Sequence, residues 1–159
     1  MRITVVCVGK IKEKFFRDAI DEYMKRLSRH AKLEITEVAD EKTPDNASER
    51  QEEQIRDIEG DRILKNVPDS AYTVLLAING EQVTSEGLAK KIADLQVKGE
   101  SHICFIIGGS LGTSEAVYKR ADYKLSFSKM TFPHQLMRVV LLEQIYRAYK
   151  INAGEPYHK

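Results

Sequence analysis

Three segments of the sequence combine residue types that could bind a small ligand, and each ends or follows an apolar run. The segments are 76–81, 107–112 and 126–134. Ligands of open α/β sheets bind beyond the carboxyl ends of the strands, so three such segments predict one shared site. The glycines of 107–112 would let a ligand approach bare backbone; the alternative is a tight turn between a strand and a helix, with no ligand. This segment has neither the P-loop pattern nor the G-x-G-x-x-G spacing of dinucleotide-binding proteins.

A second candidate site is the end of the sequence, Tyr157-His158-Lys159. These side chains are of the types that stack on a base, move a proton and contact a phosphate. Chain ends usually fray, so the alternative is a disordered tail over 153–159. Arg138 and Arg147 lie in the apolar segment before this tail, and buried arginines are normally paired or bound to a ligand.

The elements that must position these residues alternate along the chain. We expect strands over 3–8, 33–38, 72–78, 103–107 and 123–127, and helices over 15–27, 48–66, 85–98, 113–120 and 133–152. Ser48 and Gln51 have the spacing of a capping box at the start of the second helix. Asn79-Gly80 is a turn dipeptide that should close the third strand. The alternation predicts an α/β fold with a largely parallel sheet.

The final helix is apolar around nearly its whole circumference over 136–149. A helix on a protein surface needs only one apolar stripe, so this helix requires a second partner besides its own sheet. In a chain of 159 residues, the natural second partner is a copy of the same chain, which predicts a homodimer. The alternative is a central helix that is fully covered within one chain.

The charge is segregated along the sequence, although the net charge is only +1. Residues 1–36 hold nine Lys/Arg and five Asp/Glu, residues 117–159 hold eight and three, and residues 37–61 hold three and ten. This pattern indicates either ordinary solvated helix faces or an anionic partner at a basic end.

The cysteines and the apolar runs indicate the cellular compartment of the protein. Cys7 and Cys104 lie in apolar runs without a C-x-x-C spacing, so we expect buried thiols and no metal site. No apolar run approaches the roughly 20 residues that cross a bilayer, and no signal-peptide pattern is present. We expect a cytoplasmic protein without membrane partners.

Four motifs together resemble the RlmH family, minimal SPOUT-class methyltransferases of large-subunit ribosomal RNA. The motifs are Ile106–Gly112, Leu125–Arg138, Glu143–Ala148 and Pro156–Lys159, and the resemblance covers the whole chain. It implies a single SPOUT domain over 1–159, with a trefoil knot over about 103–152, a tail over 153–159 and a homodimer. Threaded chains are rare, so the knot is expected from the resemblance alone.

The resemblance also implies an activity. S-adenosylmethionine would methylate N3 of a pseudouridine in 23S rRNA within the assembled ribosome, without a metal. The implied cofactor-binding residues are Leu76, Gly108, Phe127, Ser128, Lys129, Met130, Thr131 and Phe132. The implied catalytic residues are Arg147, Tyr157 and His158, with His158 and Arg147 as candidates for removing the acceptor proton or stabilising the anion.

The residues themselves are compatible with two other classes of function. The first is a non-enzymatic, dimeric, ribosome-associated RNA-binding factor, which would leave the glycine segment without a ligand. The second is a small dehydrogenase or similar nucleotide-binding enzyme, which needs an acidic residue after the second strand opposite a glycine loop. Glu37 fits that position, but Gly9 stands alone after the first strand.

Overall fold

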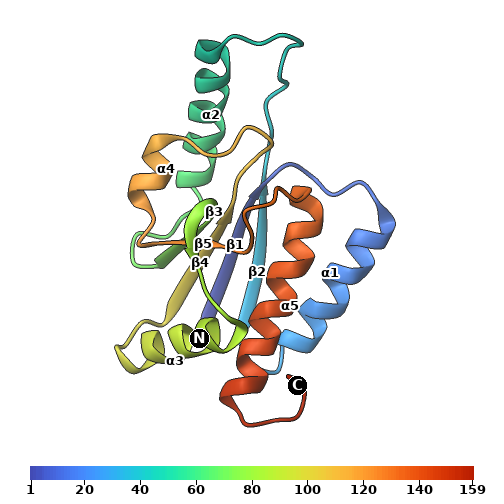
Figure 1. Ribbon diagram of the computed structural model, residues 1–159, viewed down its shortest axis with the longest axis vertical. Coiled ribbons are helices and arrows are strands. Elements are labelled where there is room, and N and C mark those ends of the chain that lie inside the picture. The colour runs from blue at the N-terminus through green and yellow to red at the C-terminus, as the bar shows by residue number, and fades with distance from the viewer.

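The computed structural model describes residues 1–159 and contains one parallel sheet of five strands (Figure 1). The strands are β1 (Arg2–Val8), β2 (Lys32–Val38), β3 (Tyr72–Gln82), β4 (His102–Ile107) and β5 (Tyr123–Ser126). Their order across the sheet is β2-β1-β4-β3-β5, and every neighbouring pair is parallel. The predicted α/β class with a parallel sheet is confirmed.

Five helices cover the two faces of the sheet. They are α1 (Lys14–Leu27), α2 (Glu49–Leu64), α3 (Ser85–Val97), α4 (Glu115–Arg120) and α5 (His134–Asn152). The first, third and fifth helices pack on one face, and α2 and α4 pack on the other (Figure 1). The central strands β1 and β4 are buried along nearly their whole length because both of their faces are covered.

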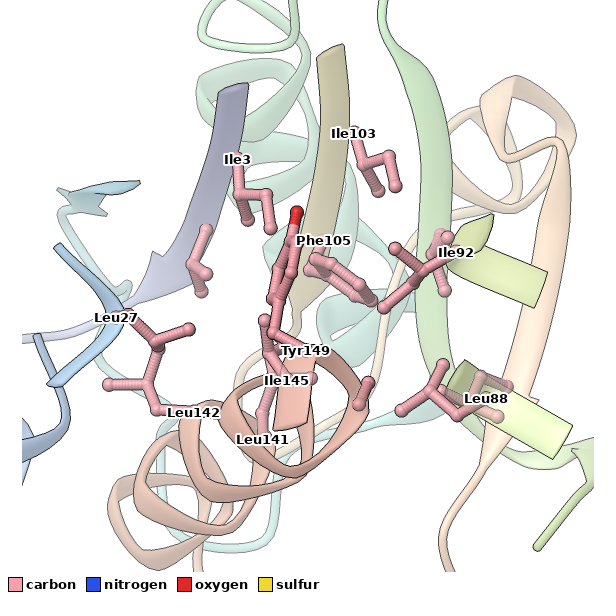
Figure 2. Close-up of a cluster of buried hydrophobic side chains, with 14 of the residues drawn as sticks. Ile3, Leu27, Leu88, Ile92, Ile103, Phe105, Leu141, Leu142, Ile145 and Tyr149 are labelled. Carbon is pink, nitrogen blue, oxygen red and sulfur yellow. The ribbon is translucent and has the colours of Figure 1, made fainter. Parts of the chain in front are cut away.

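The larger core lies between the sheet and α1, α3 and α5 (Figure 2). In that view Ile3 and Phe105 from the strands meet Leu142 of α5 and Ile92 of α3. The alternate strand residues, among them Val6 and Ile106, form a second core with α2 and α4. This alternation follows from the period of two in a strand.

The helix starts follow the predicted capping chemistry. The Ser48 hydroxyl accepts a hydrogen bond from the Gln51 backbone N–H (3.1 Å), and the Gln51 side chain accepts one from the Ser48 N–H (2.8 Å). This reciprocal pair is the predicted capping box. Thr84 and Ser114 cap α3 and α4 without the reciprocal bond: their hydroxyls accept from the backbone N–H groups of Gly87 and Val117.

The prediction of a turn at Asn79-Gly80 is wrong, because β3 continues through both residues to Gln82. The register with β5 shifts here, so that Leu125 lies opposite both Leu76 and Glu81. A Cβ atom at Gly80 would lie only 2.7 Å from the Lys124 backbone. The glycine therefore allows a bulged strand to approach its neighbour closely, a use of glycine that differs from turn formation.

Helix α5 lies between α1 and α3 on its face of the sheet (Figure 1). Leu141, Leu142 and Ile145 are fully buried against the sheet. Val140 on the same helix is only partly buried, and Leu136 is 37% exposed. Packing within one chain therefore accounts for one apolar stripe and leaves part of a second stripe open. The homodimer stays a prediction, as does the knot over 103–152.

The two thiols are buried, as predicted. Burial raises the pKa of Cys7 to about 11 and that of Cys104 to about 12, so both remain protonated and unreactive at neutral pH. None of the helices is both long enough and apolar enough to span a membrane.

Candidate active site

A cavity of about 600 Å³ lies at the carboxyl ends of β3, β4 and β5. Small-molecule sites usually measure about 300–1,000 Å³. The chain leaves β4 toward α4 on one face of the sheet, whereas β3 and β5 lead to α3 and α5 on the other face. Crevices that bind ligands form where neighbouring strands diverge in this way. The three segments predicted from the sequence meet at this cavity.

Seven of the eight residues implied for cofactor binding line the cavity: Leu76, Gly108, Phe127, Ser128, Met130, Thr131 and Phe132. The eighth, Lys129, belongs to the same loop but is not among the lining residues. The loop bends at Ser128, whose carbonyl accepts from the Ser126 hydroxyl (3.0 Å) and whose hydroxyl accepts from the Met130 N–H (3.0 Å).

The glycine segment after β4 forms a tight turn of its own. The Gly112 N–H donates to the Gly109 carbonyl (3.1 Å), and Gly112 has a φ of +87°. A Cβ atom at Gly108 would lie 2.6 Å from the Thr113 methyl carbon and 3.2 Å from the Gly112 carbonyl oxygen. The absence of a side chain at Gly108 is thus required by the packing of the turn itself.

His134, the last residue of the predicted segment 126–134, lines the cavity. Lining residues outside the three predicted segments include Arg56 from α2, Tyr118 from α4 and Met137 from α5. Arg56 is the only lysine or arginine among the lining residues. Burial, aided by the nearby Arg138, lowers the pKa of His134, so this imidazole is neutral at pH 7. No sequence motif marks Arg56, because only the tertiary fold brings α2 to the cavity.

The three residues implied for catalysis gather at the other end of α5. Arg147 donates to Glu143 (2.7 Å) and to Nδ1 of His158 (3.0 Å), and Nε2 of His158 lies 2.6 Å from Glu86. Arginine only donates, so Nδ1 accepts, and the proton on Nε2 is donated to the Glu86 carboxylate. Both nitrogens of His158 are therefore engaged in this arrangement.

Tyr157 also docks on its own chain. Its ring meets Tyr146 edge to face, with centroids 4.9 Å apart, and the Arg147 guanidinium lies 4.7 Å from the ring centroid. Burial raises the pKa of Tyr157, and the hydrogen bond to Glu143 raises the pKa of Arg147, so both keep their protons at neutral pH. The alternative of a frayed, contact-free tail is wrong for these residues.

The two predicted groups lie far apart within one chain. Met137 lines the cavity, and Arg147 lies ten residues further along α5, which is about 15 Å at 1.5 Å per residue. Figure 1 shows α5 running away from the carboxyl edge of the sheet to the C-terminus at the opposite edge. One chain therefore does not bring its catalytic candidates to its own cavity.

Arg138, the other arginine of α5, is 2% exposed and fully paired on its two terminal nitrogens. It contacts Glu37 (2.6 Å) and the backbone carbonyls of Val8 (3.1 Å) and Gly9 (2.6 Å). Glu37 is thereby occupied, so it is not the free acidic residue that a dinucleotide enzyme would require. No group of three or more His, Cys, Asp or Glu side chains is placed to hold a metal ion.

Comparison with known proteins identifies the family. A family model described as "Predicted SPOUT methyltransferase" matches residues 1–158. The chain is 67% identical to the ribosomal RNA large subunit methyltransferase H of Bifidobacterium adolescentis and 64% identical to that of Clostridium novyi, over 100% of each chain.

Two solved structures share the fold. A methylase family protein from Haemophilus influenzae matches 99% of this chain and 70% of its own, with a TM-score of 0.55 and 12% identity. A Legionella pneumophila protein described as a methyltransferase, with S-adenosylmethionine bound, matches 93% of this chain and 66% of its own, with a TM-score of 0.51 and 11% identity. From the full-length relatives and the family model, the chain belongs to the SPOUT methyltransferase family and to the RlmH proteins within it.

Proposed function

We propose that this protein methylates N3 of a pseudouridine in large-subunit ribosomal RNA, acting on the assembled ribosome as a cytoplasmic homodimer. Membership of the family makes the chain a methyltransferase, and S-adenosylmethionine is its methyl donor. The relatives are named for methylation of large-subunit ribosomal RNA. The observation in this structure that carries the proposal is the cavity at the carboxyl edge, which joins three loops of suitable chemistry.

The residues around the cavity fit S-adenosylmethionine. Apolar side chains such as Leu76 and Phe132 suit the faces of an adenine ring, and the backbone of 127–131 offers donors and acceptors for its edge. Arg56, which contacts Glu49 (3.3 Å) and Glu52 (4.0 Å), is the one arginine at the cavity that can also meet the single carboxylate of the methionine moiety. The absence of any lysine among the lining residues suits a ligand whose sulfur carries a positive charge.

The bound cofactor supplies an electrophilic methyl group on a cationic sulfur. The chain must then hold the acceptor nitrogen in line and exclude water from it. Met130 (72% exposed) and Phe132 (41% exposed) lie at the cavity and can shield the reacting groups from water. The acceptor N3 loses its proton during the reaction, and the Arg147 guanidinium can stabilise the resulting negative charge. His158 can accept a proton at Nδ1 only after Arg147 releases that nitrogen, because Nε2 already carries the proton that it donates to Glu86.

The distance between the two ends of α5 supports a site built by two subunits. The partly exposed stripe around Val140 could pack on the same stripe of a second copy. Two antiparallel α5 helices would place Arg147, Tyr157 and His158 of one subunit beside the cavity of the other. A single SPOUT domain over 1–159 with a knot over 103–152 is part of the same proposal.

The two other classes of function do not account for these observations. A non-enzymatic, ribosome-associated factor would have no ligand for the cavity, and the family is one of methyltransferases. A dinucleotide-dependent enzyme would need the Glu37 carboxylate that Arg138 occupies.

Methylation of ribosomes from cells that lack this protein tests the proposal. We expect transfer of labelled methyl from S-adenosylmethionine, with 3-methylpseudouridine as the product in nuclease digests analysed by mass spectrometry. Calorimetry should detect S-adenosylmethionine binding and no NAD binding. A different methylated nucleotide would refute the pseudouridine assignment, and faster methylation of naked 23S rRNA would refute the assembled ribosome as substrate.

A further inference from the structure

The two basic segments of the sequence converge at the amino edge of the sheet, where α1 and α5 end side by side (Figure 1). The ring of Tyr146 joins them. The Arg26 guanidinium lies 5.8 Å from its centroid, the Lys150 ammonium 5.7 Å, and the His30 ring centroid 5.9 Å. Cations from two distant parts of the sequence therefore surround one aromatic side chain.

Three acidic side chains in this region are paired with cations, whereas Asp21, one turn before Lys25 on α1, is exposed and makes no ion pair. Glu22 contacts Arg26 (2.9 Å), and Glu155 contacts Lys150 (2.5 Å). Glu143 in turn contacts Arg147 (2.5 Å).

Lys25, Arg29 and Lys159 are exposed and have no acidic partner. Positive charge is therefore in excess at this end of the molecule. The acidic segment 37–61 supplies α2 and the loop before it, which extend to the opposite end (Figure 1). The charge segregation seen along the sequence is thus also a segregation in space.

We propose that this basic surface binds the phosphodiester backbone of ribosomal RNA beside the nucleotide that is methylated. The surface consists of Lys25, Arg26, Arg29, His30, Tyr146 and Lys150. The inference rests on the proposed function, because it assigns the RNA contacts of the same enzyme. Exposed lysines and arginines bind phosphates through charge, and neighbouring aromatic rings suit unpaired bases.

The position of the surface links it to the reaction. Tyr146 contacts Tyr157, and Arg147, the next residue on α5, contacts His158. RNA held on the surface would therefore lie next to the side chains proposed to act on the substrate. The acidic end of the molecule would repel the same polyanion, so that RNA approaches in one orientation.

The favourable interaction of positive charge with a helix dipole does not account for all of the lysines and arginines at this end of the molecule. Lys25 and Arg26 occupy the last turn of α1, where positive charge favourably meets the helix dipole. Arg29 lies beyond the helix, however, and Lys159 lies in the tail. These two residues contribute positive charge that no helix end requires.

A pair of charge reversals with a matched control tests the proposal. Lys25→Glu/Arg29→Glu alters the surface, whereas Lys42→Glu/Arg50→Glu makes the same change in net charge in the acidic segment. All four residues are exposed and make no ion pair, so neither variant removes an internal contact. The measurements are the affinity for unmethylated ribosomes at several salt concentrations, the steady-state kinetics of methylation and the affinity for S-adenosylmethionine.

The first variant should bind ribosomes at least about tenfold more weakly, with a salt dependence flatter by about two phosphate contacts. Its KM for ribosomes should rise while kcat and the affinity for S-adenosylmethionine stay within about twofold of the wild type. The control variant should match the wild type in all of these measurements. Lys25→Gln/Arg29→Gln should show the same direction of change with a smaller size.

Several outcomes would overturn this proposal without touching the proposed function. Unchanged ribosome affinity in a Lys25→Glu/Arg29→Glu variant, beside an active wild type, would show that RNA does not bind here. Conversion of that variant to a monomer would show a subunit contact in place of an RNA contact. Equally tight binding of the wild type to phosphatidylglycerol vesicles would show a surface for anionic lipid headgroups. Failure of the wild type to methylate ribosomes would instead refute the proposed function.

Discussion

The two ends of α5 differ in almost every respect that matters for chemistry. At its start, loops supply apolar side chains and bare backbone around a cavity with one arginine. At its end, Arg147 and His158 are bound to Glu143 and Glu86, and neither residue lines that cavity. The first arrangement can hold a cofactor but has few groups to act on an acceptor. The second has such groups but does not border that cavity. The proposed two-subunit site needs both ends, and one straight helix keeps them about 15 Å apart.

Separating the two proposed subunits should have the largest effect on activity. Val140→Glu places a charge on the partly exposed stripe of α5 and should give a folded monomer. Because each cavity then loses the opposite end of its partner's α5, methylation of ribosomes should fall a thousandfold or more, about 4.1 kcal/mol. Sedimentation velocity and circular dichroism would establish the folded monomer.

The neighbouring position provides the contrast. Leu141 is 0% exposed and belongs to the core drawn in Figure 2, so Leu141→Glu should prevent folding altogether. A Val140→Glu monomer that methylates at the wild-type rate would show that one chain is a complete enzyme.

Removal of the tail tests the charged end alone. Deletion of Tyr157 to Lys159 should leave folding, dimerisation and S-adenosylmethionine binding intact, because the cavity lies at the other edge of the sheet. Methylation should drop about a hundredfold, roughly 2.7 kcal/mol of transition-state stabilisation. If His158 moves the proton, the smaller loss in His158→Ala should shrink at high pH, where the acceptor ionises unaided. A truncated enzyme at the full rate would contradict this assignment.

Gly108 tests the cofactor end alone. Gly108→Ala should weaken S-adenosylmethionine binding about tenfold, or 1.4 kcal/mol, because the added Cβ atom meets the Thr113 methyl at 2.6 Å and displaces the turn. Thr113→Ser removes that methyl, so Gly108→Ala/Thr113→Ser should recover most of the affinity in calorimetry. Equal affinity of the single variant and the wild type would remove the turn from the site.

The difference between the two ends also decides what the sequence could predict. Strand ends and glycines are local features, so 76–81, 107–112 and 126–134 were recognisable as one site from their pattern alone. Arg56 was not, because its place at the cavity depends on how α2 packs over α4. Asn79-Gly80 was misread as a turn, because the reason for Gly80 is the backbone of a strand that is distant in sequence.

The smallest expected effect concerns Glu86, which fixes the resting position of the tail. In this arrangement the Nε2–H of His158 donates a hydrogen bond to Glu86, and Nδ1 accepts one from Arg147, so neither nitrogen is free to take part in the reaction. In the proposed two-subunit site, His158 must therefore release these contacts before it can move a proton, and Glu86→Ala should ease that step. The Glu86 side chain is 61% exposed, and exposed ion pairs contribute little, so kcat should rise only about two- to threefold. Asp94→Ala on the same helix removes a comparable exposed pair with Lys90 and should leave the rate unchanged. A fall of more than tenfold in Glu86→Ala would mean that Glu86 holds His158 in its working position. The tail of one subunit would then act at its partner's cavity without moving.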